Sequence, residues 1–135
     1  MFDTKIAIIV RDDLAVWQKL NVTAFLTSGI LAENPGIAGE PYEDAAGNAY
    51  SRLSAQPVIV LSADHETMAK IHRRGLDRNV GLALYIEDMF ETGHDAANRA
   101  TVRRRTPDDM RIVGLALRDQ KKIVDKITKG ARLHP

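Results

Sequence analysis

Four short runs of mainly apolar residues recur along the chain, and each is bounded by polar or turn-forming residues. The runs cover residues 5–10, 57–61, 80–86 and 111–117. Five to seven residues is the length of a strand rather than of a helix, and valine, isoleucine and leucine dominate these runs. The pattern therefore predicts four strands that are buried in a core.

The stretch after the first run has helical spacing. Apolar residues at three- and four-residue steps follow Asp12 and Asp13, either of which can cap the first turn of a helix. This helix is expected to end near Pro35, because a proline disfavours the α conformation of the residue before it, here Asn34.

Helices are also expected after the second and fourth runs. Ser62 or Asp64 can cap a helix that runs to about residue 74 and is closed by Gly75. Residues 119–129 alternate in charge, with apolar residues on one face, which is typical of an amphipathic helix. The polar segment 89–106 is read as a loop or a short helical segment.

The least regular stretch is 35–57, where Gly47-Asn48 between Tyr42 and Tyr50 favours a small hairpin, with a loop as the alternative. Strands that alternate with helices predict a single α/β domain over residues 1–135. We expect three layers, with a mixed sheet of about four strands and helices on both faces.

Composition and charge narrow the class of protein. The chain has 135 residues, 44% apolar and 27% charged, as in ordinary globular domains, and it has no cysteine. The net charge of +1 divides into −5 up to Thr67 and +6 after it. The basic half is consistent with an anion-binding face or simply with solvated helices. Because no basic leader or long apolar span is present, we expect a cytoplasmic protein without membrane contact.

Several kinds of chemistry have no support in the sequence. The P-loop, the dinucleotide glycine fingerprint and the nucleophile elbow are all absent. His65 and His72 are seven residues apart, whereas the zinc-binding pair of a metalloprotease helix is four apart. We therefore expect no metal and no cofactor.

Two segments hold candidate binding residues, because each follows a predicted strand, where open α/β sheets bind their ligands. The first supplies Arg11, Asp13, Trp17, Gln18, Lys19 and Asn21. The second supplies Asp88, Phe90, Thr92, His94, Asn98 and Arg99. Carboxylate, hydroxyl and imidazole groups can serve as a general base and its partners. The alternative is structural: Trp17 is core, and the aspartates and Thr92 are helix caps.

These segments resemble the type-2 peptidyl-tRNA hydrolase fold, and more closely a related bacterial family of uncharacterised domains. The matching residues are Arg11-Asp12-Asp13-Leu14, then Ile86, Asp88 and Thr92, then 124–128 and 131–134 near the C-terminus. The chain departs from the hydrolase pattern at several positions. The lysine of the pattern stands one position early, at Lys19, and Ala24 and Thr27 stand where the hydrolases have a glutamine and a histidine. Met89-Phe90 replaces an alanine-glycine pair.

The resemblance implies a homodimer and catalytic roles for Lys19, Asp88 and Thr92 in cleaving an ester of peptidyl-tRNA or a related acyl substrate. The departures favour instead a protein that keeps the fold and binds a small ligand or a partner. Candidate ligands include tRNA and other phosphate-bearing molecules. Whether the chain is an enzyme stays open. In either case the two segments are expected to share one cleft, with Trp17 and Phe90 as its apolar walls and Lys19 and Asp88 as its opposite charges.

Overall fold

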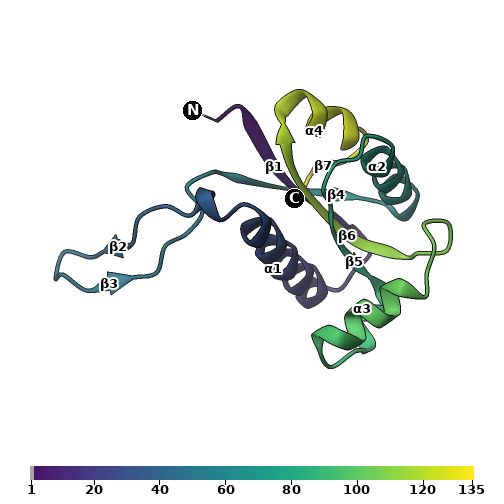
Figure 1. Ribbon diagram of the computed structural model, residues 1–135, viewed down its shortest axis with the longest axis horizontal. Helices are drawn as coiled ribbons and strands as arrows, with labels where there is room; N and C mark the ends of the chain where they lie inside the picture. The colour runs from purple at the N-terminus through teal and green to yellow at the C-terminus, as the bar shows by residue number, and fades with distance from the viewer. Residues whose placement is uncertain (1) are drawn as a thin grey trace.

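The computed structural model describes residues 2–135 and shows a twisted sheet between helices, with one hairpin extending away from the body (Figure 1). The strands are β1 (Thr4–Arg11), β2 (Tyr42–Glu43), β3 (Ala49–Tyr50), β4 (Val58–Ala63), β5 (Ala83–Ile86), β6 (Ile112–Gln120) and β7 (Arg132–Leu133). The helices are α1 (Val16–Glu33), α2 (His65–Asp77), α3 (Asp95–Arg103) and α4 (Lys121–Ile127), with short 3-10 turns η1 (Pro35–Ile37) and η2 (Glu87–Glu91).

The main sheet has five strands in the order β5-β6-β1-β4-β7. β1 pairs in parallel with β4 and antiparallel with β6, which itself pairs antiparallel with β5. The mixed sheet and its four predicted strands are thus confirmed, but the expected number of about four omits β7. That strand has two exposed residues and is defined only by its pairing with β4, so it has no apolar run to mark it.

The central strand β1 explains why the first apolar run does not alternate with polar residues. Its even-numbered residues Ile6, Ile8 and Val10 belong to the core cluster under α1. Ala7 and Ile9 belong to the cluster under α2 and α4 on the opposite face. A strand covered on both faces is apolar at every position, and the expected helices on both faces are confirmed.

The start of α1 differs from the prediction. The helix begins at Val16 after the N-cap residue Ala15, whose N–H donates to Gln18 Oε1 over 3.0 Å. Neither aspartate caps it. Asp13 is held instead by Arg11, whose Nε donates to the Asp13 carboxylate over 2.6 Å. Asp13 therefore forms an ion pair with the buried guanidinium of Arg11 instead of capping α1.

The prediction for α2 is right at its start and wrong at its end. Asp64 is the N-cap and accepts from the Thr67 N–H over 2.8 Å. Gly75, however, lies within the helix, because it provides room for Leu82: a Cβ at this position would meet Leu82 Cδ1 at 2.8 Å. This glycine serves packing and does not end the helix.

The remaining elements follow the sequence with shifted boundaries. β2 and β3 form the expected hairpin, with Tyr42 opposite Tyr50. The segment 89–106, left open between loop and helix, contains part of η2 and all of α3. The last helix starts at Lys121 rather than at Asp119, because β6 stays paired with β1 as far as Gln120.

Candidate functional site

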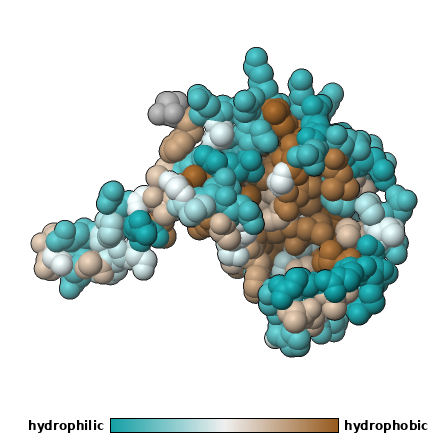
Figure 2. All heavy atoms as spheres, viewed as in Figure 1, coloured by the Kyte–Doolittle hydropathy of each residue, from teal (hydrophilic) through white to brown (hydrophobic). Residues whose placement is uncertain are grey.

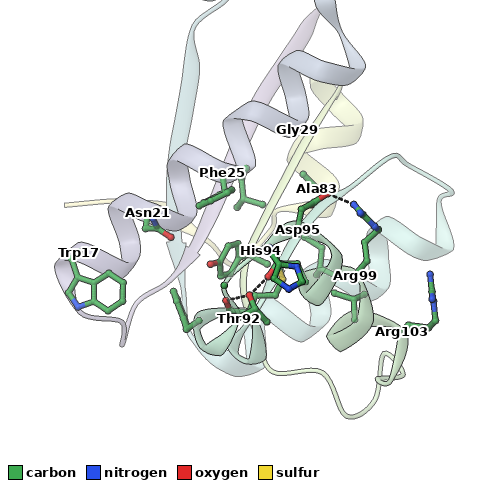
Figure 3. A pocket seen from close by; sticks show the side chains of 18 residues that line it. Trp17, Asn21, Phe25, Gly29, Ala83, Thr92, His94, Asp95, Arg99 and Arg103 are labelled. Atoms are coloured by element: carbon green, nitrogen blue, oxygen red, sulfur yellow. Dashed lines mark hydrogen bonds and ion pairs between the residues drawn. The ribbon is translucent and has the colours of Figure 1, made fainter.

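A hollow of about 820 Å³ opens between α1, β5, η2 and α3 (Figure 3). We call it the α1–α3 pocket. One wall is a ridge of α1 formed by Trp17, Asn21, Phe25 and Gly29. These residues recur every four positions, which places them on one side of a helix and beside the core-facing residues Val22, Leu26 and Ile30.

Aromatic rings from three elements meet in the α1–α3 pocket. Trp17 of α1 and Phe90 of η2 make an edge contact with ring centroids 5.9 Å apart. Phe90 lies 5.2 Å from Tyr85 of β5, which in turn lies 5.9 Å from Phe25. Four of the seven aromatic residues of the chain therefore line this one hollow. Trp17 is 62% exposed and Phe25 is 54% exposed, so the wall is open to a ligand.

The opposite wall is polar and comes from η2 and α3. The single O–H of Thr92 is shared between Met89 O, 2.9 Å away, and the Asn98 side-chain oxygen, which fixes the turn into α3. His94 caps α3 by accepting the Ala97 N–H at Nδ1 over 3.2 Å. A neutral His94 ring that accepts at Nδ1 carries its proton on Nε2, so it has one donor left.

Two arginines of α3 line the same pocket. Arg99 forms an ion pair with Asp95 one turn earlier, and both side chains are largely exposed. Arg103 has no ion pair within residues 2–135. This wall therefore offers one uncompensated positive charge to a ligand.

A second, polar hollow of about 710 Å³ lies on the other side of η2 and shares Thr92 and Gly93 with the α1–α3 pocket. Asp88 lies here and accepts from Arg105 Nε and Nη2 over 3.1 and 2.8 Å. These bonds favour the charged carboxylate and hold the pKa of Asp88 below its ordinary value.

A chain of ion pairs borders the second hollow. Arg11 at the end of β1 donates to Glu87 over 2.8 Å, and Arg111 donates to the same carboxylate oxygen over 2.7 Å. Burial by itself would raise the pKa of Glu87, but the bonds from the two arginines outweigh it and the pKa is lowered. This network fixes η2, and with it Phe90 and Thr92, to the end of the sheet.

The predicted site residues thus fall into two groups. The α1–α3 pocket brings together Trp17, Asn21, Phe90, Thr92, His94, Asn98 and Arg99 from both predicted segments. The residues Arg11, Asp13, Gln18, Lys19 and Asp88 do not line it. Arg11 and Asp13 are bound to each other, Gln18 caps α1, and Asp88 is bound by Arg105. Lys19 and Asp88, expected as the opposite charges of one cleft, do not share a hollow: Asp88 borders the second hollow and Lys19 lines neither of the two.

Sequence reasoning missed Phe25 and Tyr85 as pocket residues. Phe25 could have been found, since it is four residues beyond Asn21 and eight beyond Trp17 on one helix. Alternation along a strand would let only one of the adjacent residues Glu87 and Asp88 face a given site, but both border the second hollow. The strand ends at Ile86 and a 3-10 turn follows, so strand alternation does not apply to these residues.

Two further observations concern residues 2–135 alone. No helix in that range is long and apolar enough to span a bilayer. No group of three or more histidine or acidic side chains there is arranged to hold a metal ion.

The fold and the pocket define a mixed α/β protein with an open, aromatic-lined hollow beside the β5 edge of its sheet. The chain belongs to the family described as protein of unknown function (DUF2000), which matches residues 4–135. It is similar to the solved structure of a protein of unknown function from Agrobacterium tumefaciens strain C58, with 62% identity, 100% of both chains covered and a TM-score of 0.99. None of the curated proteins matches it.

The expectation of a family of uncharacterised domains is confirmed by this match. The relation to peptidyl-tRNA hydrolases stays a prediction.

Proposed function

We propose that the chain binds a small molecule that carries a flat apolar ring system and an anionic or hydrogen-bond-accepting group, and that it does so in the α1–α3 pocket. The observation that carries the proposal is the convergence of Trp17, Phe25, Tyr85 and Phe90 on one open hollow. Exposed aromatic rings cost free energy in water, and a concave apolar wall with a few polar groups is the usual form of a ligand site.

The polar wall determines which ring compounds fit. Arg103 offers a guanidinium without an ion pair, and the neutral His94 ring offers one N–H donor. A carboxylate, sulfonate or phosphate on the ligand would accept hydrogen bonds from these groups while its ring lies against Trp17 and Phe90. An uncharged aliphatic ligand would leave them without partners, so we expect weaker binding of such compounds.

The test uses 8-anilinonaphthalene-1-sulfonate, which joins a flat ring system to an anion. We expect saturable binding, detected by the rise in probe emission and the change in emission of the single tryptophan, Trp17. Phe90→Ala and Arg103→Met should each weaken binding by about tenfold. Arg78→Met is the matched control, because Arg78 is an exposed arginine at the end of α2 and outside the pocket. Equal binding by the Arg103 and Arg78 variants would contradict the proposed anion contact.

One observation favours a second candidate, the ester hydrolase that the peptidyl-tRNA hydrolase resemblance implies. Thr92 borders both hollows, so an acyl group in the α1–α3 pocket would place its ester near Asp88. Arg105 keeps Asp88 ionised, and a carboxylate can accept a proton from water. The low pKa makes it a weak base, and Lys19 does not line either hollow. We therefore rank hydrolysis second.

Incubation with peptidyl-tRNA at equal protein and substrate concentrations tests this second candidate. If the chain is a hydrolase, the wild type cleaves and Asp88→Asn does not. Asp108→Asn is the control, since Asp108 is another exposed carboxylate paired with an arginine, Arg73. Binding of tRNA through the arginines of α3 would weaken steeply as salt rises. Absence of cleavage by the wild type would remove the hydrolase candidate and leave the ligand-binding proposal intact.

A further inference from the structure

The exposed apolar residues of the chain are concentrated on two elements. Eleven large apolar side chains are exposed within residues 2–135, and seven of them lie on α1 or on the segment 38–55. On α1 they are Val16, Trp17, Leu20 and Phe25; on the segment 38–55 they are Tyr42, Tyr50 and Leu53. Surfaces of this kind mark places where another molecule binds.

The segment 38–55, which we call the arm, leaves the body of the molecule as an extended hairpin (Figure 1), with only its root near the body (Figure 2). Every residue from 40 to 53 is exposed. The root is closed by bonds from Gly39 N to Leu53 O over 2.8 Å and from Ala55 N to Ile37 O over 2.7 Å. Between residues 40 and 53 the arm therefore has no packing surface among residues 2–135, and a two-stranded hairpin without one is only marginally stable in water.

The tip of the arm nevertheless has a defined shape. The Asp44 carboxylate accepts hydrogen bonds from the backbone N–H groups of Ala46 and Asn48, from the Asn48 side chain and from the Tyr50 hydroxyl, over 2.7 to 3.0 Å. Gly47 supplies the left-handed residue that the turn requires, with φ of +87°. An ordered projection of this kind fits a surface outside its own body.

The outer face of α1 is an exposed surface without charged residues. No charged residue occurs between Lys19 and Glu33, although the helix lies on the surface of the molecule. Leu20, which points away from the core residues Val22 and Leu26, is 68% exposed. An exposed helix face without charges that presents large apolar side chains such as Leu20 is expected to be covered by another surface.

A second copy of this chain could cover both the arm and the outer face of α1. The arm reaches about eight residues from root to tip, or about 26 Å of strand. The 18 residues of α1 span about 27 Å, so the two elements match in length. The arm also carries Glu40, Glu43 and Asp44 against one arginine, while Lys19 on α1 and Arg99 and Arg103 on α3 provide positive charges beside the helix.

We propose that the arm of one copy lies along the outer face of α1 of a second copy, and that the second arm does the same in return. Two such contacts related by a two-fold axis form a closed dimer in which each chain supplies one arm and receives one. This interface gives a specific surface to the homodimer that the family resemblance implies. It does not depend on the ligand proposed for the α1–α3 pocket.

Sedimentation of the purified full chain from nanomolar to high micromolar concentration tests the interface. We expect a monomer–dimer equilibrium, and the emission of Trp17 should shift to shorter wavelength as the dimer forms, because Trp17 adjoins the covered face. Leu20→Glu and Leu53→Glu should each raise the dimer dissociation constant at least about a hundredfold. Leu76→Glu, at an exposed leucine of α2 on the opposite face of the sheet, should leave it unchanged.

Circular dichroism checks that each variant is folded, as expected for substitutions at exposed positions. A wild type that stays monomeric at all concentrations would overturn the proposal, and the arm would then have to bind another molecule. A dimer that survives either Leu20→Glu or Leu53→Glu would also overturn it, because the proposed contact needs both elements. Loss of the dimer in Leu76→Glu would point to an interface elsewhere.

Discussion

Arg11 is the residue on which the geometry of the site depends most. Its guanidinium is buried at the end of the central strand and joins Asp13, before α1, to Glu87, at the start of η2. A buried charge is stable only when it is paired and hydrogen-bonded, and Arg11 satisfies this with partners from two elements. The same residue that the sequence marks as a ligand contact thus holds together the two segments that carry the pocket.

The two arginines bound to Glu87 differ in burial, which gives a matched stability prediction. The Arg11 side chain is 6% exposed and that of Arg111 is 58% exposed. We expect Arg11→Met to lower the free energy of unfolding by about 3 kcal/mol, because it leaves Asp13 and Glu87 without their buried partner. Arg111→Met should cost under about 1 kcal/mol, as for surface ion pairs. Urea unfolding measures both, and equal losses would contradict the role given to Arg11.

His72 gives a prediction of pH dependence. Burial of His72 on the inner side of α2, aided by the neighbouring charge of Arg73, lowers the pKa of His72 below its ordinary value of 6.5. As pH falls through about 6.5, the unfolded chain takes up a proton that the folded chain resists, so the unfolding free energy should fall until the pH reaches the lower folded pKa. Replacement by glutamine should flatten this slope when unfolding is measured between pH 7.5 and 5, about the range in which histidine titrates.

His65 is the control for this pH prediction, because it lies exposed in the first turn of the same helix. His65→Gln should leave the dependence of the unfolding free energy on pH as it is in the wild type. If His72→Gln keeps the full slope, another group is responsible for it.

At the scale of elements, α1 shows how one helix can serve three surfaces. Val22, Leu26 and Ile30 face the core, the ridge from Trp17 to Gly29 faces the pocket, and Leu20 faces outward. Because apolar residues occupy all three sides, the helix has little amphipathic contrast. The sequence therefore predicts that a helix is present but does not show which side is buried.

Close packing of α1 on the sheet leads to a third stability prediction. A Cβ at Gly114 of β6 would lie 2.4 Å from Val22 Cγ1 and 2.8 Å from Leu26 Cδ1. We expect Gly114→Ala to lower the free energy of unfolding by about 2 kcal/mol through overpacking. It should also weaken binding of the naphthalene sulfonate probe, since α1 must move away from β5.

The control for Gly114→Ala is Gly81→Ala, where a Cβ meets nothing within 4 Å. Thermal unfolding and probe titration of the two variants separate packing from the general effect of replacing glycine. Loss of stability without any change in probe binding would contradict the link between this packing contact and the α1–α3 pocket.

The elements that could be predicted are those with a local cause. Strands such as β1 were predicted because they are buried on both faces and hence apolar throughout. The start of α1 was predicted too early, since it depends on the ion pair between Arg11 and Asp13 and on their distant partner Glu87. β7 was missed because it exists only through pairing with β4. Features that arise from tertiary contacts cannot be predicted from the spacing of residues along the sequence.

The candidate site, too, could be predicted only where its residues are placed by local structure. Trp17 and Phe90 could be assigned to one cleft because each follows a strand that ends at the same edge of the sheet. The partner of Asp88 could not be predicted from the sequence. Arg105 is 17 residues away, in a turn after α3, and no sequence rule links the two residues. The roles of Lys19, Asp88 and Thr92 in catalysis stay predictions.

At the scale of the whole molecule, the body and the arm should behave as two regions of very different stability. β1 lies between β4 and β6 in the centre of the sheet, and its residues from Ile6 to Arg11 are buried. In the arm, every residue from 40 to 53 is exposed. Local opening costs least free energy where few apolar contacts must be broken.

Amide hydrogen exchange gives the corresponding prediction. In dilute solution, where the proposed dimer would be dissociated, the amides of β1 should exchange only through global unfolding, while those of the arm exchange orders of magnitude faster. At concentrations where the proposed dimer would form, protection should rise in the arm and along α1, because the proposed contact covers both, and should stay the same in α2 on the opposite face. Arm amides that remain equally fast at every concentration would mean that no second copy covers them, whereas a uniform rise over all elements would indicate a general gain in stability instead of a contact between arm and helix.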